Sequence, residues 1–525
     1  MTRTHRTCVS WRRRLGLTAM AAAIGVLALG SAAFADPTAV TTPAIPGVAP
    51  LPGPLVDPGK PAETTKLMTA KPDVVTAGTQ VTFSAAGLPA SSEATLVYMT
   101  SNIRWMLDTK PDSVDYLGRK VEKIAVSLGK AQTDAAGNFS MTVTTPIDFG
   151  GLHDLYVVVN GVQVAKGGLL IKRIVTMSPK KGPVGTPITI RVVGLAAPTY
   201  ESLGAVLYDN KFVGTVSGNM TRGESTFKLR AAGEPGAHWI DFGDSSHNMP
   251  YLNLEQSPIP WVAGLRMKFT VTEGTANLAP KTEWPVDVAP TVDQRTTLLK
   301  ANLAPDSKAT AALSATSGFV LSKTRITAAG LTPSQPVNLV WSTVVGNRVN
   351  CTGQCWSFVP VPLGNATAAA DGSLATDVTV PDGLGGWHVI QLVQAGKVMA
   401  QVPYFVKRNF INMPKVVKAG KPFIIELKGV GWTQLDNTTA VTYDNAYMGY
   451  ACGFNSNGYV RIQMFATGGP GIHLIDLYPL LYTQQPAYPY LQLGMVPFLS
   501  WRTDFPGLAA GYQIPAFRLA IKVVA

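Results

Sequence analysis

Four histidines that share one local sequence are the residues of this chain that first suggest chemistry. Histidine is scarce, with six in 525 residues, and an imidazole can act as a general base or a metal ligand near neutral pH. Each of the four follows a glycine-containing turn and begins an alternating apolar run, as in GGPGIHLIDL at 468–477. Such a repeat indicates either a set of ligands or a repeated fold. The four residues are His153, His238, His388 and His473.

Metal binding is the less favoured explanation of the repeated histidine. A metal site needs three or four donors around one ion, whereas each copy of the pattern supplies one histidine. The richest stretch, HWIDFGDSSH at 238–247, contains two histidines and two aspartates, but its counterpart at 473–482 retains one of each. We therefore expect no metal and no cofactor, with His238 and His247 as the weaker alternative. We expect all four histidines to have a structural role, holding a turn to the start of a strand by a hydrogen bond.

Catalytic chemistry finds little support in the remaining motifs. The tripeptide YDN at 208–210 and 443–445 places an acid beside a tyrosine, but Asp-Asn between two alternating runs is a strong signal of a tight hairpin turn. The G-x-S-x-G elbow of serine hydrolases does not occur in the sequence, and the acids single out no pair for glycoside cleavage. We therefore expect a non-enzymatic protein and rank a secreted hydrolase last.

The N-terminus has the pattern of a secretory signal peptide at residues 1–35. Five arginines precede an apolar run, and the tripeptide AFA at 33–35 matches a cleavage site before Asp36. Removing five arginines lowers the formal net charge from +12 to +7, and the remaining Lys and Arg form no cluster with aromatic residues of the kind that binds nucleic acid. No later run reaches the roughly 18 apolar residues that span a bilayer. We expect an exported protein at the cell surface, in the periplasm or outside the cell, without a nucleic acid partner or a membrane span after cleavage.

The cysteines of the mature chain suggest one small disulfide. In an oxidising compartment, the sequence CTGQC predicts a bond between Cys351 and Cys355. The remaining Cys452 lies in the apolar stretch YACGF, which predicts an inert buried thiol.

An internal duplication is the strongest pattern in the sequence. Short β-branched or alternating runs, separated by Gly, Pro, Asn and Asp, predict an all-β fold. GTPITIRVVG at 185–194 matches GKPFIIELKG at 420–429, and the offset of 235 (420 − 185) recurs between the two YDN tripeptides (443 − 208). The same offset separates the histidines in pairs (388 − 153 and 473 − 238). A constant offset across so many landmarks indicates one A–B pair of modules copied in tandem.

The repeat divides the mature chain into four modules. A proline-rich linker at 36–65 precedes them, and a second linker at 276–310 separates the two pairs. We call the modules A1 (66–172), B1 (173–275), A2 (311–408) and B2 (409–525).

The modules resemble the bacterial immunoglobulin-like modules of secreted and surface proteins, including the group called IPT/TIG. The matching motifs are AGL-x-P after the second strand, DAAGNF at 134–139 and ADGSL at 370–374 in a hairpin, and P-G-x-H at the start of a late strand. The resemblance implies that each module of about 100 residues is a seven-stranded immunoglobulin-like β-sandwich. It thereby implies a rod-like protein of four sandwiches in tandem, in the order A–B–A–B.

Two stretches have apolar residues at helical spacing. DSVDYLGRKVEKIAVSL at 112–128 predicts a helix, inserted in a loop between strands where A1 is eight residues longer than A2 (341 − 98 = 243, against 235). TVDQRTTLLKANL at 291–303 predicts a helical turn or more in the second linker.

The connections between the last two strands of the B modules are the best candidates for a binding surface, because they are rich in aromatic residues. Tyrosine and tryptophan offer large contact area at low entropic cost and stack on sugars or bind a partner. The alternative is that these side chains seal the joint between modules. The candidates are Tyr478, Tyr482, Tyr488, Tyr490 and Trp501 in B2, with Tyr251 and Trp261 in B1.

These features together predict a structural, adhesive or scaffolding element at or outside the bacterial cell envelope. A carbohydrate- or polymer-binding protein that uses the aromatic connections of the B modules is the alternative. Expected partners are an extracellular or envelope protein or a glycan, and self-association stays open.

A titration tests the metal alternative at 238–247. Because one histidine per module supplies too few donors, zinc or copper added to the fragment 173–275 is expected to show no binding tighter than millimolar by calorimetry. Tighter binding would restore the metal site.

Overall fold

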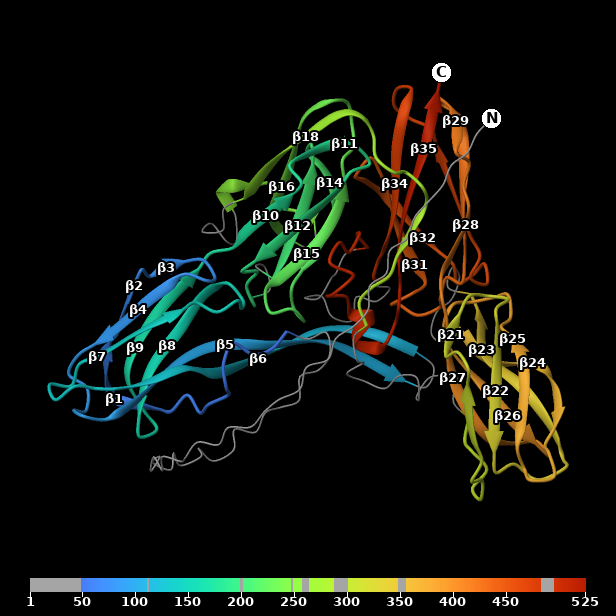
Figure 1. Ribbon diagram of the computed structural model, residues 1–525, viewed down its shortest axis with the longest axis horizontal. Helices are drawn as coiled ribbons and strands as arrows, with labels where there is room; N and C mark the ends of the chain where they lie inside the picture. Colours follow the sequence, from blue (N-terminus) through green and yellow to red (C-terminus); the bar gives the residue numbers. More distant parts are fainter. Residues whose placement is uncertain are drawn as a thin grey trace, which may run out of the picture. The chain divides into compact units, whose positions relative to one another are not determined.

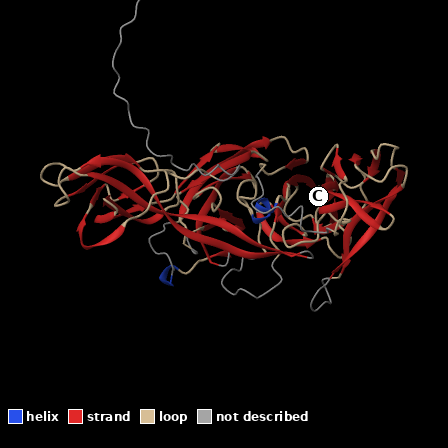
Figure 2. Cartoon of the chain, turned by 90° about the horizontal axis from the view of Figure 1, so that it is seen from below, coloured by secondary structure: helices blue, strands red, loops and turns tan. Residues whose placement is uncertain are grey.

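In the residues that it describes, the computed structural model contains β-strands joined by turns and loops, with no α-helix. It describes residues 49–110, 113–198, 202–246, 249–256, 264–287, 301–347, 356–482 and 495–525. Within these ranges the helices are two short 3-10 turns, η1 (Leu254–Gln256) and η3 (Pro506–Ala510) (Figure 2). The prediction of an all-β fold is confirmed. The predicted signal peptide lies outside the described residues, as do residues 291–300 of the helical turn predicted at 291–303, and the described residues 301–303 are not helical.

Module A1 contains one small and one larger sheet. Alternate side chains of the strands are buried, as in β4, because each sheet has one face toward the core. Phe83 and Phe139 of the small sheet belong to one apolar cluster with Leu96 and Leu155 of the larger one. The small sheet has the order β2 (Thr69–Lys71), β4 (Gln80–Ala85), β7 (Phe139–Thr144), and the larger one β1 (Lys60–Leu67), β9 (Val162–Ile171), β8 (Gly151–Val159), β5 (Glu93–Lys110), β6 (Ser113–Gln132), with β3 (Val74–Val75) also beside β9.

Module B1 repeats this arrangement (Figure 1). The order of its small sheet is β10 (Ile174–Ser178), β12 (Pro187–Val193), β15 (Glu224–Arg230). The order of its larger sheet is β11 (Lys181–Val184), β18 (Leu265–Thr275), β16 (Gly236–Ser246), β13 (Leu203–Tyr208), β14 (Lys211–Ser217), with β17 (Met249–Pro250) beside β16.

Modules A2 and B2 follow the same plan. The sheets of A2 are β20 (Thr310–Leu313), β22 (Lys323–Ala329), β25 (Leu374–Thr379) and β21 (Ser317–Gly318), β27 (Lys397–Val406), β26 (Gly386–Gln394), β23 (Pro336–Gly346), β24 (Trp356–Thr367). The small sheet of B2 is β28 (Asn409–Asn412), β30 (Pro422–Lys428), β33 (Val460–Phe465). Its larger sheet is β19 (Lys281–Glu283), β35 (Ala516–Val524), β34 (Gly471–Pro479), β31 (Thr438–Tyr443), β32 (Ala446–Cys452), with β29 (Val416–Lys418) beside β35.

The helix predicted at 112–128 is wrong, because residues 113–128 belong to the strand β6. Strands β5 and β6 pair from Glu93–Gln132 to Lys110–Ser113, with register shifts at Leu96/Val97 and Met106/Leu107, and the ribbon extends beyond the rest of its sheet (Figure 1). The helical spacing of apolar residues is overridden by pairing with β5, which is itself rich in β-branched and aromatic residues. The extra length of A1 therefore lies within a hairpin and not in a helical loop.

Both predicted linkers contribute pairing to the sheets. Within the first, the amide of Val56 donates to the carbonyl of Ala125 at 3.1 Å, and β1 begins at Lys60. Within the second, β19 pairs with β35 of B2. The proline content of the first linker predicts an extended, largely disordered spacer, but its described part adds to the open edge of a sheet. The described parts of these segments are therefore built into neighbouring modules.

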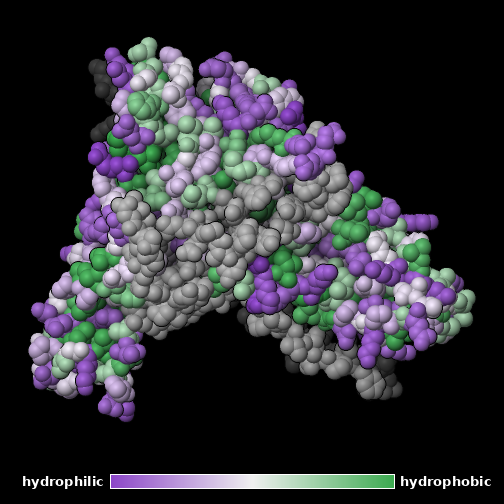
Figure 3. All heavy atoms as spheres, turned by 180° about the vertical axis from the view of Figure 1, so that it is seen from behind, coloured by the Kyte–Doolittle hydropathy of each residue, from purple (hydrophilic) through white to green (hydrophobic). Residues whose placement is uncertain are grey.

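No helix in the described ranges is long and apolar enough to cross a membrane. Large apolar side chains on the surface occur in separate small groups among hydrophilic ones in the view of Figure 3.

Candidate functional site

The four repeated histidines have the same position and the same contacts. Each is the third residue of its strand, β8, β16, β26 or β34. The Nε2 atom lies 2.8–3.0 Å from the carbonyl oxygen of the residue four positions earlier. Each ring also stacks on an aromatic ring of a neighbouring strand at a centroid distance of 4.5–5.7 Å. The stacking residues are Tyr98, Tyr208, Trp341 and Tyr443.

In the B modules the YDN tripeptide and the histidine form one unit. Asp444 and Asn445 have positive φ angles of 46° and 62° in the turn between β31 and β32, so the predicted hairpin turn is confirmed. The Asp444 carboxylate lies 2.6 Å from Nδ1 of His473 and accepts a hydrogen bond from the amide of Leu474 at 2.8 Å. His238 and Asp209 repeat this contact in B1 at 2.5 Å. Both motifs are visible in the sequence, but their contact follows only from strand pairing.

His388 of A2 and His473 of B2 lie in opposite electrostatic surroundings. The hydrogen bond with Asp444 is the main cause that raises the pKa of His473. Burial lowers the pKa of His388 to about 4, because a charged imidazole loses its hydration in the core of A2. These contacts make each histidine part of the fold. Among the described residues, no cluster of three His, Cys, Asp or Glu side chains forms a metal site, and His247 lies outside the described residues.

The aromatic connection of B2 is buried where the structure describes it. Tyr478 and Trp501 are 0% and 1% exposed, so the prediction that they present a binding surface is wrong. Tyr482 and Tyr251 are half-buried. The other three candidates, Tyr488, Tyr490 and Trp261, lie outside the described residues, as do Cys351 and Cys355.

This connection closes a joint with B1 through backbone pairing. Thr215 of β14 donates its amide to the carbonyl of Pro497 at 2.9 Å and accepts from the amide of Leu499 at 2.8 Å. Next to it, the Ser217 amide donates to Oγ of Ser500 at 3.0 Å. Segment 497–500 therefore pairs with the edge of the B1 sheet, which explains why its aromatic neighbours are covered.

Asp504 joins three modules at one buried carboxylate. Its Oδ1 accepts a hydrogen bond from Nε1 of Trp105 in A1 at 2.8 Å, and its Oδ2 accepts from the amide of Asn219 in B1 at 2.6 Å. The carboxylate is 0% exposed, and burial raises its pKa. Trp105 and Asp504 are 399 positions apart. These contacts join B2 to A1 and B1, which are not its neighbours in the sequence, and they do not fit the expected rod-like row of modules.

A buried ionic cluster forms a second joint between B1 and B2. Arg230 at the end of β15 reaches Oδ1 of Asp476 at 2.5 Å and donates to the carbonyl of Leu519 at 2.5 Å. Arg518 pairs with the same carboxylate at 3.3 Å and donates to the hydroxyl of Tyr478 at 2.6 Å. Each guanidinium thus has several acceptors, as a buried charge requires.

The first copy of this ion pair is exposed. Arg266 and Asp241 in B1 lie 2.6 Å apart, and the Arg266 side chain is 60% exposed. In B2, the counterpart pair Arg518 and Asp476 is buried because Arg230 and its strand cover it. The duplicated sequence therefore gives the same pair two environments.

Cys452 is exposed, so the prediction of a buried thiol is wrong. It is the last residue of β32, where alternate side chains point away from the core. Its Sγ lies 3.6 Å from Oγ1 of Thr438.

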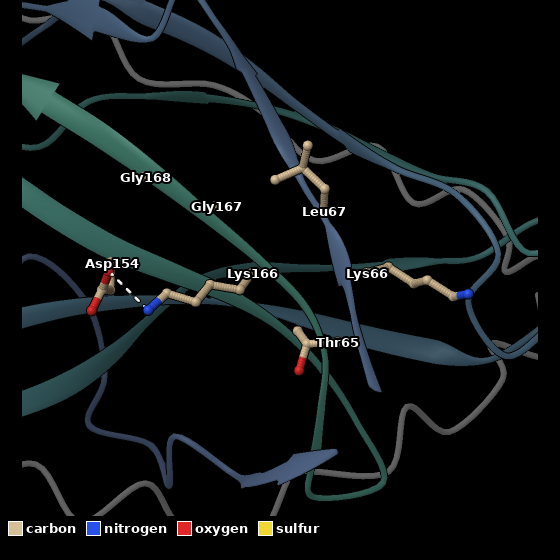
Figure 4. Close-up of a pocket in the computed structure, with 7 residues that line it drawn as sticks. All are labelled: Thr65, Lys66, Leu67, Asp154, Lys166, Gly167 and Gly168. Carbon is tan, nitrogen blue, oxygen red and sulfur yellow. Dashed lines mark ion pairs between the residues drawn. The ribbon is translucent and has the colours of Figure 1, made fainter. Parts of the chain in front are cut away.

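A shallow hollow of about 420 Å³ lies beside β1, β8 and β9 in A1 (Figure 4). It forms where the pairing of β1 with β9 shifts register between Pro61 and Lys66. Lys166 and Asp154 pair across it at 3.3 Å, and both are half exposed. Because these charges satisfy each other, the hollow presents no chemistry beyond an ordinary surface ion pair.

Comparison with known proteins assigns no family. No family model and no curated protein matches the chain. Among solved structures, Salmonella alpha-2-macroglobulin reacted with methylamine has a TM-score of 0.17 at 9% identity, covering 88% of this chain and 31% of its own. An ectodomain fragment of ICAM-5 has a TM-score of 0.16 at 11% identity, covering 88% of this chain and 100% of its own. The human OSCAR ligand-binding domain has a TM-score of 0.13 at 16% identity, covering 34% and 89%. The chain thus spans less than a third of the macroglobulin, and scores this low assign no fold family.

The histidines predict opposite pH dependence in A2 and B2. Below its ordinary pKa of about 6.5, His388 binds a proton in the unfolded chain but in the folded chain only near pH 4. Its contribution to stability is therefore lost as the pH falls from about 6.5 to 4, by up to about 3 kcal/mol. His388→Gln should remove this acid sensitivity from urea unfolding curves.

His473 serves as the matched control for that measurement. Its raised pKa means that its contribution is fully present below about pH 6.5 and is lost as the pH rises through the folded pKa. His473→Gln should therefore reduce the loss of the free energy of unfolding as the pH rises above about 6.5. Identical pH profiles for the two variants would contradict both assignments.

Loss of one donor at Asp504 should loosen the joint of the three modules. Trp105→Phe keeps an aromatic ring but removes the hydrogen bond to Asp504, so we expect a loss of about 1–2 kcal/mol in the free energy of unfolding. Arg325→Gln, which removes an exposed ion pair with Asp377, is the control and should change stability by less than about 0.5 kcal/mol. Equal effects of the two variants in urea unfolding would show that the joint contributes nothing.

Proposed function

We propose that the chain is an exported, non-enzymatic protein of four immunoglobulin-like β-sandwiches in the order A–B–A–B. In this proposal it is a structural, adhesive or scaffolding element at or outside the bacterial cell envelope. The resemblance of its turn motifs to IPT/TIG-like modules supports the sandwich assignment.

The strand order within each module supports the same assignment. In A1, β2 pairs antiparallel with β4 of the small sheet, and β3 follows it and pairs parallel with β9 of the larger sheet. The chain therefore passes from the small sheet to the larger one between β2 and β3. The pairs β10 and β11, β20 and β21, and β28 and β29 do the same in the other modules. A first segment that passes between the two sheets is a device of packed β-sandwiches.

The contact of Asp504 in B2 with both A1 and B1 is the observation that carries the scaffolding proposal. A binding protein with flexible arms would need separate modules, whereas a spacer needs modules at fixed positions. Backbone pairing of Thr215 with 497–499 and the ionic cluster around Asp476 add further joints. Together these joints favour an assembly of modules in fixed positions over a chain of modules that move independently.

Carbohydrate binding by the aromatic connections of the B modules has lost its main support. Tyr478 and Trp501 lie in the joint, and Tyr478 is covered by the guanidinium of Arg518 at 4.7 Å. Sealing of the joint, the alternative interpretation of these residues, accounts for their burial.

Cell fractionation tests the proposed location and role. We expect the protein in the envelope fraction or in surface filaments, with a mature N-terminus at Asp36 by mass spectrometry. A variant that lacks residues 1–35 is the control and should stay in the cytoplasm. Recovery only as a freely diffusing monomer in the medium would contradict the scaffolding role, and an intact N-terminus would contradict export by cleavage.

A further inference from the structure

We propose that a hollow lined by Trp284, Trp387 and Phe405 binds a neutral pyranose ring of an extracellular polysaccharide. The hollow has a volume of about 390 Å³, within the usual range of about 300–1,000 Å³ for small-molecule sites. It differs from the aromatic connections considered above, and no motif of the sequence indicated it.

Three segments that are distant in the sequence build this hollow. The second linker contributes Trp284 and Asp287, which follow β19. Module A2 contributes Trp387 from β26 and Lys407, the residue after β27. Module B2 contributes Gln513, which follows η3. Because β19 pairs with β35, the tryptophan of the second linker is carried to the face of A2. The site therefore depends on the way B2 incorporates the linker strand.

The aromatic rings are held in fixed orientations. Phe405 is buried and packs edge-on against Tyr512, with centroids 6.0 Å apart. Trp387 packs at a steep angle on Phe405 at 5.0 Å, and Trp284 contacts Phe319 at 6.4 Å. Both tryptophans remain partly exposed. Rigid, partly exposed rings lose little entropy when an apolar face of a ligand stacks on them.

Polar side chains of both charges surround the rings. Asp287 is exposed, Lys407 lies 5.3 Å above the ring of Trp284, and Gln513 adds an amide. Within the described ranges, no hydrogen bond or ion pair occupies the side chains of Asp287 and Gln513. These groups can donate to and accept from hydroxyls.

This combination fits a sugar better than other small ligands. A pyranose has an apolar C–H face for stacking and a rim of hydroxyls that both donate and accept hydrogen bonds. A phosphate or nucleotide would require an excess of positive charge, which Asp287 offsets. A quaternary ammonium ligand would require an aromatic cage without a cation, but Lys407 lies over Trp284. A neutral hexose unit can stack its apolar face on the aromatic rings and form hydrogen bonds with the polar side chains that line the hollow.

Titration of the full-length mature protein with defined oligosaccharides tests the proposal. The probes are hexaoses of α- and β-linked glucose, mannose and galactose, followed by tryptophan fluorescence and calorimetry. We expect saturable binding of at least one of them. Trp387→Ala and Trp284→Ala should each weaken it by about tenfold or more through the loss of stacking.

A matched tryptophan and two polar variants keep this test decisive. Trp239 in B1 is 42% exposed and lies outside the hollow, so Trp239→Ala should bind like the wild type. If a tryptophan variant unfolds, Asp287→Asn and Gln513→Ala, both at the rim, should still weaken binding about threefold. Failure of every hexaose to bind at millimolar concentration, or binding unchanged in all four hollow variants, would overturn the proposal. Neither result bears on the fractionation test of the scaffold.

Discussion

The arrangement of the modules depends on the cost of burying the carboxylate of Asp504. A carboxylate removed from water is stable only when donors surround it, and here the donors come from different parts of the chain. The indole of Trp105 reaches it from the β5–β6 hairpin of A1, and the amide of Asn219 reaches it from B1. Moving any of these modules away would leave a buried donor or acceptor unpaired. The need of this carboxylate for donors therefore constrains the positions of A1, B1 and B2 relative to one another.

The ionic cluster around Asp476 shows how a duplicated protein can build an interface from repeated parts. Both B modules have an aspartate–arginine pair between their last two strands, but Arg230 covers it only in B2. The offset of 235 places Phe465 at the position of Arg230, and Phe465 is 52% exposed. The two B modules have therefore diverged at this position: Arg230 of B1 covers the ion pair of B2, whereas Phe465 of B2 is exposed. The cluster gains acceptors such as the carbonyls of Ile475 and Leu519, which compensate the guanidinium for lost water.

The repeated histidine illustrates a structural device that keeps its geometry while its chemistry varies. The bond from Nε2 to the carbonyl four residues earlier and the aromatic stack occur in all four modules. The partner of Nδ1 is an aspartate in the B modules and a backbone carbonyl for His153. A charged partner suits the half-exposed end of a B module, whereas burial suits the neutral ring of His388. The same position in the fold therefore accommodates both an imidazole beside a carboxylate and a fully buried one.

The sequence by itself determined the all-β class, the hairpin turns at YDN and the repeat of 235 residues. These depend on period-two alternation and on turn residues, which act over a few neighbouring positions. Only the tertiary structure decided that 113–132 pairs as a strand, that Trp501 is buried and that Trp284 and Trp387 share a hollow. Local spacing is compatible with either outcome in each case. The choice depends on which distant segment packs against the residue, because burial is a property of pairs of surfaces that sequence neighbours do not specify.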